Sequence, residues 1–153
     1  MKKIGIVTLN DYVNFGNRLQ NYALVKYLNE FNNCEVYNIW PKSNKFIIKD
    51  IIKRFIFTNK FKRISKFRKF NKLINTASSF EDFDYYVVGS DQVWNPQWLV
   101  EETMLLSNIK SSNKISYAAS FGVNEISNTD KKIFKKYLAN FKRKCLSKYY
   151  RYY

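Results

Sequence analysis

Hydrophobic and polar positions in the first forty residues follow two different periods, and together they predict a β-α-β unit. Residues 3–9 form a short apolar, β-branched run closed by polar residues, which is typical of a strand buried on both faces of a parallel sheet. Apolar residues then recur at helical spacing between Leu19 and Phe31. A second strand over 35–40 ends at Pro41, which has no N–H to donate to a sheet. The crossover between these strands should be right-handed.

The second half of the chain repeats this alternation of strands and helices. Strands are predicted over 85–88 and 114–119, where β-branched and aromatic residues dominate. A helix follows with its apolar positions between 133 and 138, and its N-cap is Asn128 or Thr129. The pattern therefore predicts an α/β fold, with a mostly parallel, Rossmann-like sheet and flanking helices.

The chain is long enough for one domain, and its charge is unevenly distributed. It has 153 residues, of which 46% are hydrophobic, and a formal net charge of +15. A domain of 1–140 is expected, followed by an irregular tail over 141–153 in which no further strand is recognised. Twelve Lys or Arg residues and a single acidic one, Asp50, lie between Lys42 and Lys72. We expect a basic helical insertion over 42–75.

The basic insertion has three possible roles. Isoleucines and phenylalanines recur on one side of its predicted helices and cations on the other, as in a helix packed on the sheet with a solvated lysine face. The same pattern would suit binding to an anionic membrane surface. Nucleic acid is the least favoured partner, because no recognised binding module is present.

Several classes of function are excluded by composition. The chain contains no histidine, so it cannot supply a Ser-His-Asp centre or a histidine-ligated metal site. Cys34 and Cys145 stand far apart with no CxxC motif, which argues against a thiolate metal site. No metal or cofactor is therefore expected. The apolar run at 4–9 is too short for a signal peptide, so we expect the protein in the cytoplasm.

Three polar loops should meet at one edge of the predicted sheet. They cover 10–17, 89–95 and 120–122, and each directly follows a predicted strand. The carboxyl ends of parallel strands share one edge, and open α/β sheets bind their ligands there. Ser120 and Gly122 are the candidate binding residues of the third loop.

The first of these loops leads into a helix whose N-terminal N–H groups could hold an anion. The candidate binding residues here are Asn14, Gly16, Asn17 and Gln20. Alternatively, Asn14 caps the helix and Gly16 only forms the turn.

The loop after residues 85–88 is the richest in functional groups. It brings together Ser90, Asp91, Gln92, Trp94 and Asn95. This mixture suits a sugar, whose hydroxyls would bind the polar groups while its apolar face stacks on Trp94. Asp91 is the candidate catalytic residue, because it could orient or deprotonate an acceptor hydroxyl. In the alternative interpretation, Ser90 and Asp91 only satisfy N–H groups of a turn.

These segments resemble successive motifs of the polysaccharide pyruvyl transferase family. The resemblance runs in order over residues 1–140 and is carried by the segments IGIVTL (4–9), NFGNRLQNYA (14–23), VVGSDQVWN (87–95) and ISYAASFG (115–122). The segment GSDQVWN is the most specific of them. Members of this family have two domains arranged as in glycosyltransferases of the B type, and they transfer a pyruvyl group from phosphoenolpyruvate to a sugar of a cell-surface polysaccharide.

By this resemblance, the chain corresponds to the N-terminal, acceptor-side half of such an enzyme. The acceptor would be a sugar that can be linked to a lipid, which would place the protein at the inner face of the membrane. The second domain, which the resemblance implies as the site of the phosphoenolpyruvate donor, has no counterpart in the sequence, and we expect it to be absent. A non-catalytic domain that binds a sugar or an anionic membrane surface is the alternative.

Overall fold

The computed structural model describes residues 1–9, 14–30, 34–39, 61–80, 83–98 and 103–146. The strands in these ranges are β1 (Lys2–Val7), β2 (Cys34–Ile39), β3 (Thr76–Ala77), β4 (Tyr85–Asp91), β5 (Lys114–Ala119) and β6 (Arg143–Leu146). The α-helices are α1 (Phe15–Glu30), α3 (Phe61–Asn71) and α4 (Asn128–Leu138), and Pro96–Trp98 form the short 3-10 helix η1.

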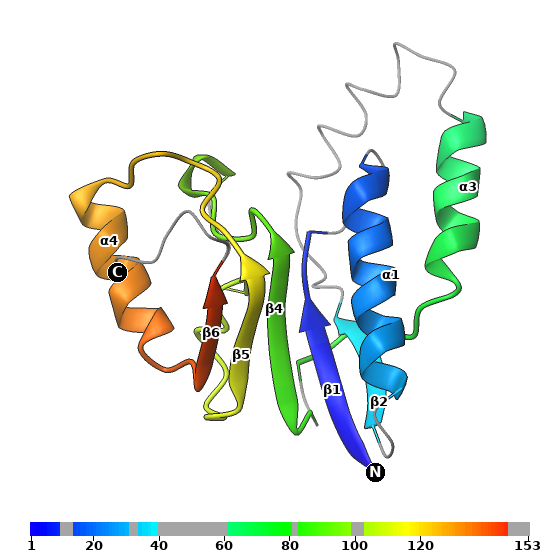
Figure 1. Ribbon diagram of the computed structural model, residues 1–153, viewed down its shortest axis with the longest axis horizontal. Coiled ribbons are helices and arrows are strands. Elements are labelled where there is room, and N and C mark those ends of the chain that lie inside the picture. Colours follow the sequence, from blue (N-terminus) through cyan, green and yellow to red (C-terminus); the bar gives the residue numbers. More distant parts are fainter. Residues whose placement is uncertain (10–13, 31–33, 40–60, 81–82, 99–102, 147–153) are drawn as a thin grey trace.

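The six strands form one sheet in the order β3-β2-β1-β4-β5-β6, and all neighbouring strands are parallel (Figure 1). This is the strand order of a Rossmann fold. The predicted α/β class and Rossmann-like sheet are therefore confirmed. The chain moves outward from β1 to β2 and β3, and then returns to β4 and continues in the opposite direction. The point where the order reverses lies between β1 and β4.

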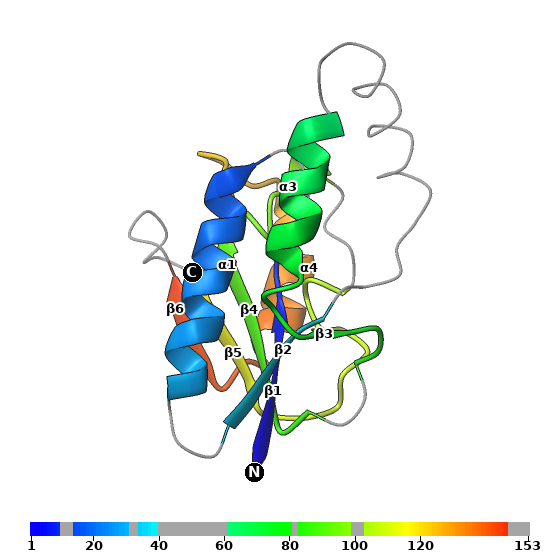
Figure 2. The same ribbon diagram turned by 90° about the vertical axis from the view of Figure 1, so that its right-hand side faces the viewer.

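Helices cover both faces of the sheet. Helices α1 and α3 lie side by side on one face, whereas α4 lies on the other (Figure 2). The first two helices are joined by aromatic contacts: the rings of Phe15 and Phe67 stack with their centroids 4.2 Å apart, and those of Tyr22 and Phe70 lie 5.3 Å apart. Helix α3 occupies Phe61–Asn71 of the predicted basic insertion, and residues 42–60 of that insertion lie outside the described residues.

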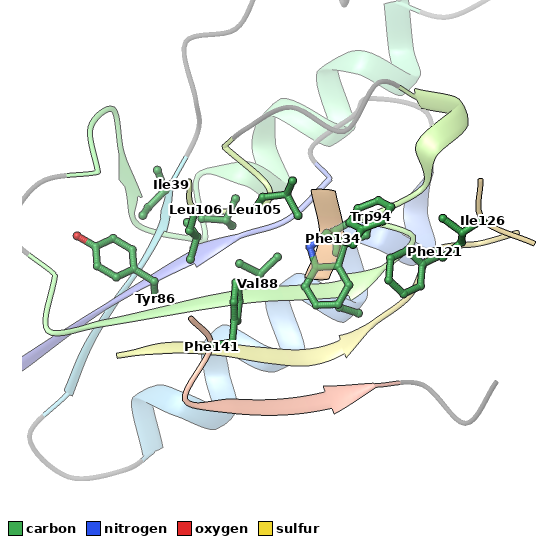
Figure 3. Packing of buried hydrophobic residues seen from close by; sticks show 13 residues of the cluster. Ile39, Tyr86, Val88, Trp94, Leu105, Leu106, Phe121, Ile126, Phe134 and Phe141 are labelled. Carbon is green, nitrogen blue, oxygen red and sulfur yellow. The ribbon is translucent and has the colours of Figure 1, made fainter. Parts of the chain in front are cut away.

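The alternation of side chains along the strands divides the apolar residues into two cores. On the side of α1, Ile4, Ile6 and Val36 pack with residues of the helix such as Leu24 and Val25. The other core is larger and more aromatic, and it lies between the sheet, the segment 103–110 and α4 (Figure 3). Its buried members include Val7, Tyr86, Val88, Trp94, Leu105, Leu106, Phe121, Phe134 and Phe141.

Two predictions for the C-terminal part were wrong. The tail is not irregular throughout, because residues Arg143–Leu146 form β6, which pairs with β5 at the edge of the sheet. The N-cap of α4 is Ser127, not Asn128 or Thr129, and its hydroxyl accepts a hydrogen bond from the N–H of Asp130. Strand β3 was also not predicted, because its two residues are too few to show a pattern.

Lys114 is a buried cation in the larger core. Only 4% of its surface is exposed, and its ammonium group donates a hydrogen bond of 2.8 Å to the carbonyl oxygen of Leu106. This bond ties the segment 103–110 to the start of β5. Burial lowers the pKa of Lys114 below its ordinary value of 10.5, because the charged form loses hydration.

The lowered pKa of Lys114 predicts a pH-dependent stability. The unfolded chain binds more protons than the folded one between the lowered pKa and 10.5, so the free energy of unfolding should rise with pH in that window. In Lys114→Met this contribution is absent. Urea unfolding at pH 7 and at pH 9.5 should show the wild type gaining stability relative to the variant at the higher pH. An identical pH dependence of the two proteins would contradict this account.

Candidate functional site at the carboxyl edge of the sheet

The ends of β1 and β4 are joined by a side chain at the point where the strand order reverses. Thr8 directly follows β1, and its hydroxyl donates a hydrogen bond of 3.2 Å to the carbonyl oxygen of Ser90. In open α/β sheets the connections diverge at this point and leave a crevice in which ligands bind. We call the residues that surround it the rim: Thr8, Asn14, Gly16, Asn17, Gln20, Ser90–Asn95 and Ser120–Gly122.

The first turn of α1 is capped by a side chain of the rim. The side-chain oxygen of Asn14 accepts hydrogen bonds from the N–H groups of Gly16 and Asn17, at 2.8 and 3.4 Å. The structure thus agrees with the alternative in which Asn14 caps the helix, and these two N–H groups are already engaged. One turn later, the side-chain oxygen of Gln20 accepts a hydrogen bond of 3.3 Å from the hydroxyl of Ser90. Helix α1 is therefore linked directly to the end of β4.

The loop after β4 folds back onto the end of β5. The N–H of Ser120 donates to the carbonyl oxygen of Asp91 at 2.9 Å, and the N–H of Trp94 donates to the carbonyl oxygen of Ser120 at 3.2 Å. Asp91 has a φ of 93°, which is rare for a residue with a side chain. Its carboxylate accepts a hydrogen bond of 2.7 Å from the N–H of Gln92. The second and third predicted loops therefore meet, and the described residues of the first loop, 14–17, follow β1 at the same edge of the parallel sheet.

The side chain of Gln92, in the second loop, lies close to Gly122 in the third loop. Its side-chain oxygen accepts a hydrogen bond of 3.1 Å from the side-chain nitrogen of Asn95. Gly122 has a φ of 64°, and a Cβ atom at this position would lie 2.3 Å from the side-chain oxygen of Gln92. Gly122 thus permits both a left-handed backbone and the close approach of Gln92. Its role is to let the two loops touch.

Trp94 does not have the role that the sequence predicted. It is 0% exposed and belongs to the larger core, where its ring lies 5.7 Å from that of Phe121 and 6.0 Å from that of Phe141 (Figure 3). Its indole N–H donates to the carbonyl oxygen of Met104 at 3.0 Å. Because no face of the ring is exposed, Trp94 cannot stack on a sugar. It anchors the loop instead.

Asn95 is also buried, with 3% of its surface exposed. Its side chain donates to Gln92 and accepts a hydrogen bond of 2.9 Å from the N–H of Gln97. Both ends of its amide are therefore used within the loop. Asp91, Gln92 and Ser120 remain partly exposed, and Gln20 is exposed, so these residues are the ones placed to meet a ligand.

A layer of buried polar side chains beneath the rim was missed by the sequence analysis. In the first half of α1, Asn17, Arg18 and Asn21 occupy the buried face that Leu24 and Val25 continue. Arg18 and Asn21 are each only 2% exposed. Neither polar atom of the Asn21 side chain has a hydrogen-bond partner within the described ranges. Helical spacing of 17, 18, 21, 24 and 25 was the signal that could have revealed this face.

The rim carries little positive charge although the protein is strongly basic. Among the described residues in 8–9, 14–20, 90–98 and 120–126, Arg18 is the only cation, and its side chain is buried. Asp91 and Glu125 are the acidic residues in these segments. The rim is therefore suited to hydroxyl groups rather than to a highly charged anion.

No group of His, Cys, Asp and Glu side chains that could hold a metal ion is found in the part of the chain that the structure describes. The fold defines a Rossmann-type α/β protein, and the polar residues of the rim lie at the carboxyl ends of its strands, where open α/β sheets bind ligands.

The family of the chain follows from comparison with known proteins. The family model for polysaccharide pyruvyl transferase matches residues 14–143, which is most of the chain. The chain therefore belongs to the polysaccharide pyruvyl transferase family, and the family implies a polysaccharide acceptor. No curated protein and no solved structure matches the sequence.

The contact between Gly122 and Gln92 predicts different effects for two glycine substitutions. Gly122→Ala should lower the free energy of unfolding by about 1–2 kcal/mol, because alanine disfavours the left-handed backbone and its Cβ displaces Gln92. Gly16→Ala is the control: its Cβ would lie 3.1 Å from the side-chain oxygen of Asn14, and alanine favours the helix. Urea unfolding should therefore show a much smaller change for Gly16→Ala. Equal effects would contradict the proposed contact.

Proposed function

We propose that residues 1–140 are the acceptor-binding part of a pyruvyl transferase, which holds a sugar of a cell-surface polysaccharide at the rim. The observation that carries this proposal is the combination of a partly exposed carboxylate with several amides and hydroxyls, at an edge that has no exposed cation among its described residues. Neutral sugar hydroxyls are bound by such groups. The phosphoenolpyruvate donor, which carries several negative charges, would require a second domain.

The proposed reaction assigns one of three tasks to this part of the enzyme. The methylene carbon of phosphoenolpyruvate must be protonated, the resulting cation must be stabilised, and a sugar hydroxyl must be placed for attack on that cation. The bond to phosphate then breaks and phosphate leaves, and where the product is a ketal, a second hydroxyl of the same sugar adds to the same carbon. The rim performs the third task. Asp91 accepts the hydrogen of the attacking hydroxyl, and Gln20, Gln92 and Ser120 orient the sugar around it.

Substitution of Asp91 tests the proposed acceptor site. Asp91→Asn keeps an oxygen for the N–H of Gln92 but removes the charge, so binding of a neutral oligosaccharide should weaken about tenfold or more, since hydrogen bonds to charged groups contribute roughly 1.5–3 kcal/mol. Saturation-transfer NMR would measure binding to a panel of oligosaccharides. Asp84→Asn, just before the start of β4 and at the opposite edge of the sheet, is the matched control and should bind normally.

Thermal shifts with phosphoenolpyruvate and with the oligosaccharides, added separately, complete this test. Stabilisation by the sugar is the expected result. Stabilisation by phosphoenolpyruvate without any response to sugars would contradict the acceptor assignment.

A second candidate function is binding to an anionic membrane surface, where a lipid-linked acceptor would be found. None of the helices within the described ranges has the length and apolar character needed to span a bilayer. The observation that favours surface binding is the cationic outer side of α3, on which Lys66, Arg68 and Lys69 are exposed, together with exposed Lys72 directly after the helix. Each cation near such a surface contributes about 1 kcal/mol to binding. The residues Ile51 and Ile52 of the predicted apolar face lie outside the described residues.

Charge removal on α3 tests the membrane proposal. The triple variant with Lys66→Gln, Lys69→Gln and Lys72→Gln should lose most binding to vesicles of phosphatidylcholine and phosphatidylglycerol, and added salt should weaken wild-type binding. The control removes three exposed cations from the other side of the sheet, through Lys132→Gln, Lys135→Gln and Lys136→Gln in α4. Equal losses in both triple variants would indicate only a general charge effect.

Tighter binding to single-stranded DNA than to heparin would point to nucleic acid instead.

A further inference from the structure

The two exposed or partly exposed glutamines of the rim are oriented by hydrogen bonds to their carbonyl ends. The side-chain oxygen of Gln20 accepts from the hydroxyl of Ser90, at 3.3 Å. The side-chain oxygen of Gln92 accepts from the amide of Asn95, at 3.1 Å. An amide whose oxygen is engaged in this way presents its NH2 group to other partners.

Neither of these NH2 groups has a partner among the described residues. Gln20 is exposed and Gln92 is partly exposed, so both donors are accessible to a ligand. The two glutamines belong to different elements, α1 and the loop after β4, but both are linked to the segment that contains Asp91: Gln20 through Ser90, and Gln92 as the next residue. Both donors are therefore carried by residues connected to the segment that holds the Asp91 carboxylate.

The Asp91 carboxylate retains acceptor capacity. One of its oxygens accepts from the N–H of Gln92, and the other has no protein donor in the described part of the chain. An ionised carboxylate only accepts hydrogen bonds. The rim thus combines one acceptor with two donors whose directions are determined by neighbouring side chains.

We infer that the rim selects its sugar by hydrogen-bond polarity: Asp91 accepts from one hydroxyl, and Gln20 and Gln92 donate to oxygens next to it. This inference rests on the proposed function and names its substrate class, a neutral pyranose in which a free hydroxyl is flanked by acceptor oxygens. A sugar with a protonated amine at a flanking position is rejected, because an ammonium group has no acceptor for the glutamine NH2. Ser90 is a positioning residue that acts through Gln20.

Fluorinated sugars can test the polarity directly, because fluorine accepts weakly but cannot donate a hydrogen. The probes are a methyl pyranoside that binds the wild type and its monodeoxy and monodeoxyfluoro analogues, with affinity measured by NMR titration. At the position bound by Asp91, both replacements should weaken binding roughly tenfold. At a flanking position, the fluoro analogue should bind about threefold to tenfold more tightly than the deoxy analogue.

Variants of the two glutamines show which of them donates to each flanking position of the sugar. Gln20→Met and Gln92→Met should each abolish the difference between the fluoro and deoxy analogues at one position. Ser90→Ala should reduce the difference at the Gln20 position, since the amide of Gln20 is then free to rotate. Asn29→Met is the matched control, because Asn29 is an exposed amide on the same helix far from the rim, and it should preserve every difference.

The outcomes separate this inference from the function on which it rests. If no pyranoside of the panel binds the wild type, both the acceptor site and its polarity are wrong. If sugars bind and Asp91→Asn weakens them, but the methionine variants retain the fluoro–deoxy differences, only the inferred polarity is overturned. Thermal unfolding of each variant within about 2 °C of the wild type would show that the changes in binding do not arise from loss of the fold.

Discussion

The burial of Trp94 is the interaction on which the candidate site depends. The ring of Trp94 lies in the larger core between Phe121 and Phe141, and its indole donates to Met104. Its backbone N–H binds the carbonyl oxygen of Ser120. Ordering a polar loop of this kind costs conformational entropy, and the burial of Trp94 offsets that cost. Because the tryptophan is held on several sides, the neighbouring Asp91 and Gln92 have defined positions next to β5.

The sheet and its polar edge were predictable because they depend on simple periodicities. Short β-branched runs such as 85–88 predict buried parallel strands. A loop that directly follows such a strand must lie at the carboxyl edge of the sheet. The role of Trp94 was not predictable in the same way. An indole beside amides and a carboxylate could stack on a sugar or could fix the loop by being buried in the core. Only the burial of the ring distinguishes these two roles.

Other differences between prediction and structure also have physical causes. Strand β6 has the sequence RKCL, which contains little apolar periodicity, and it is a strand because the edge of β5 offers unpaired backbone groups. The buried Arg18 and Asn21 were overlooked because polar residues in an amphipathic helix are expected to face solvent. Their burial follows from the position of α1, whose first half covers the strand ends at the rim.

The distribution of charge gives the rim a different chemistry from the outer surfaces of the helices. A net charge of +15 would favour anionic ligands everywhere if it were evenly distributed. The exposed cations of α3 and α4 instead lie on the outer sides of the two helical layers, and the described rim has none. The proposed neutral, hydroxylated ligand would therefore depend on directed hydrogen bonds rather than on charge. Directed bonds require a rigid frame, and in this protein that frame consists of the Trp94 anchor, the Asn14 cap and the close contact between Gly122 and Gln92.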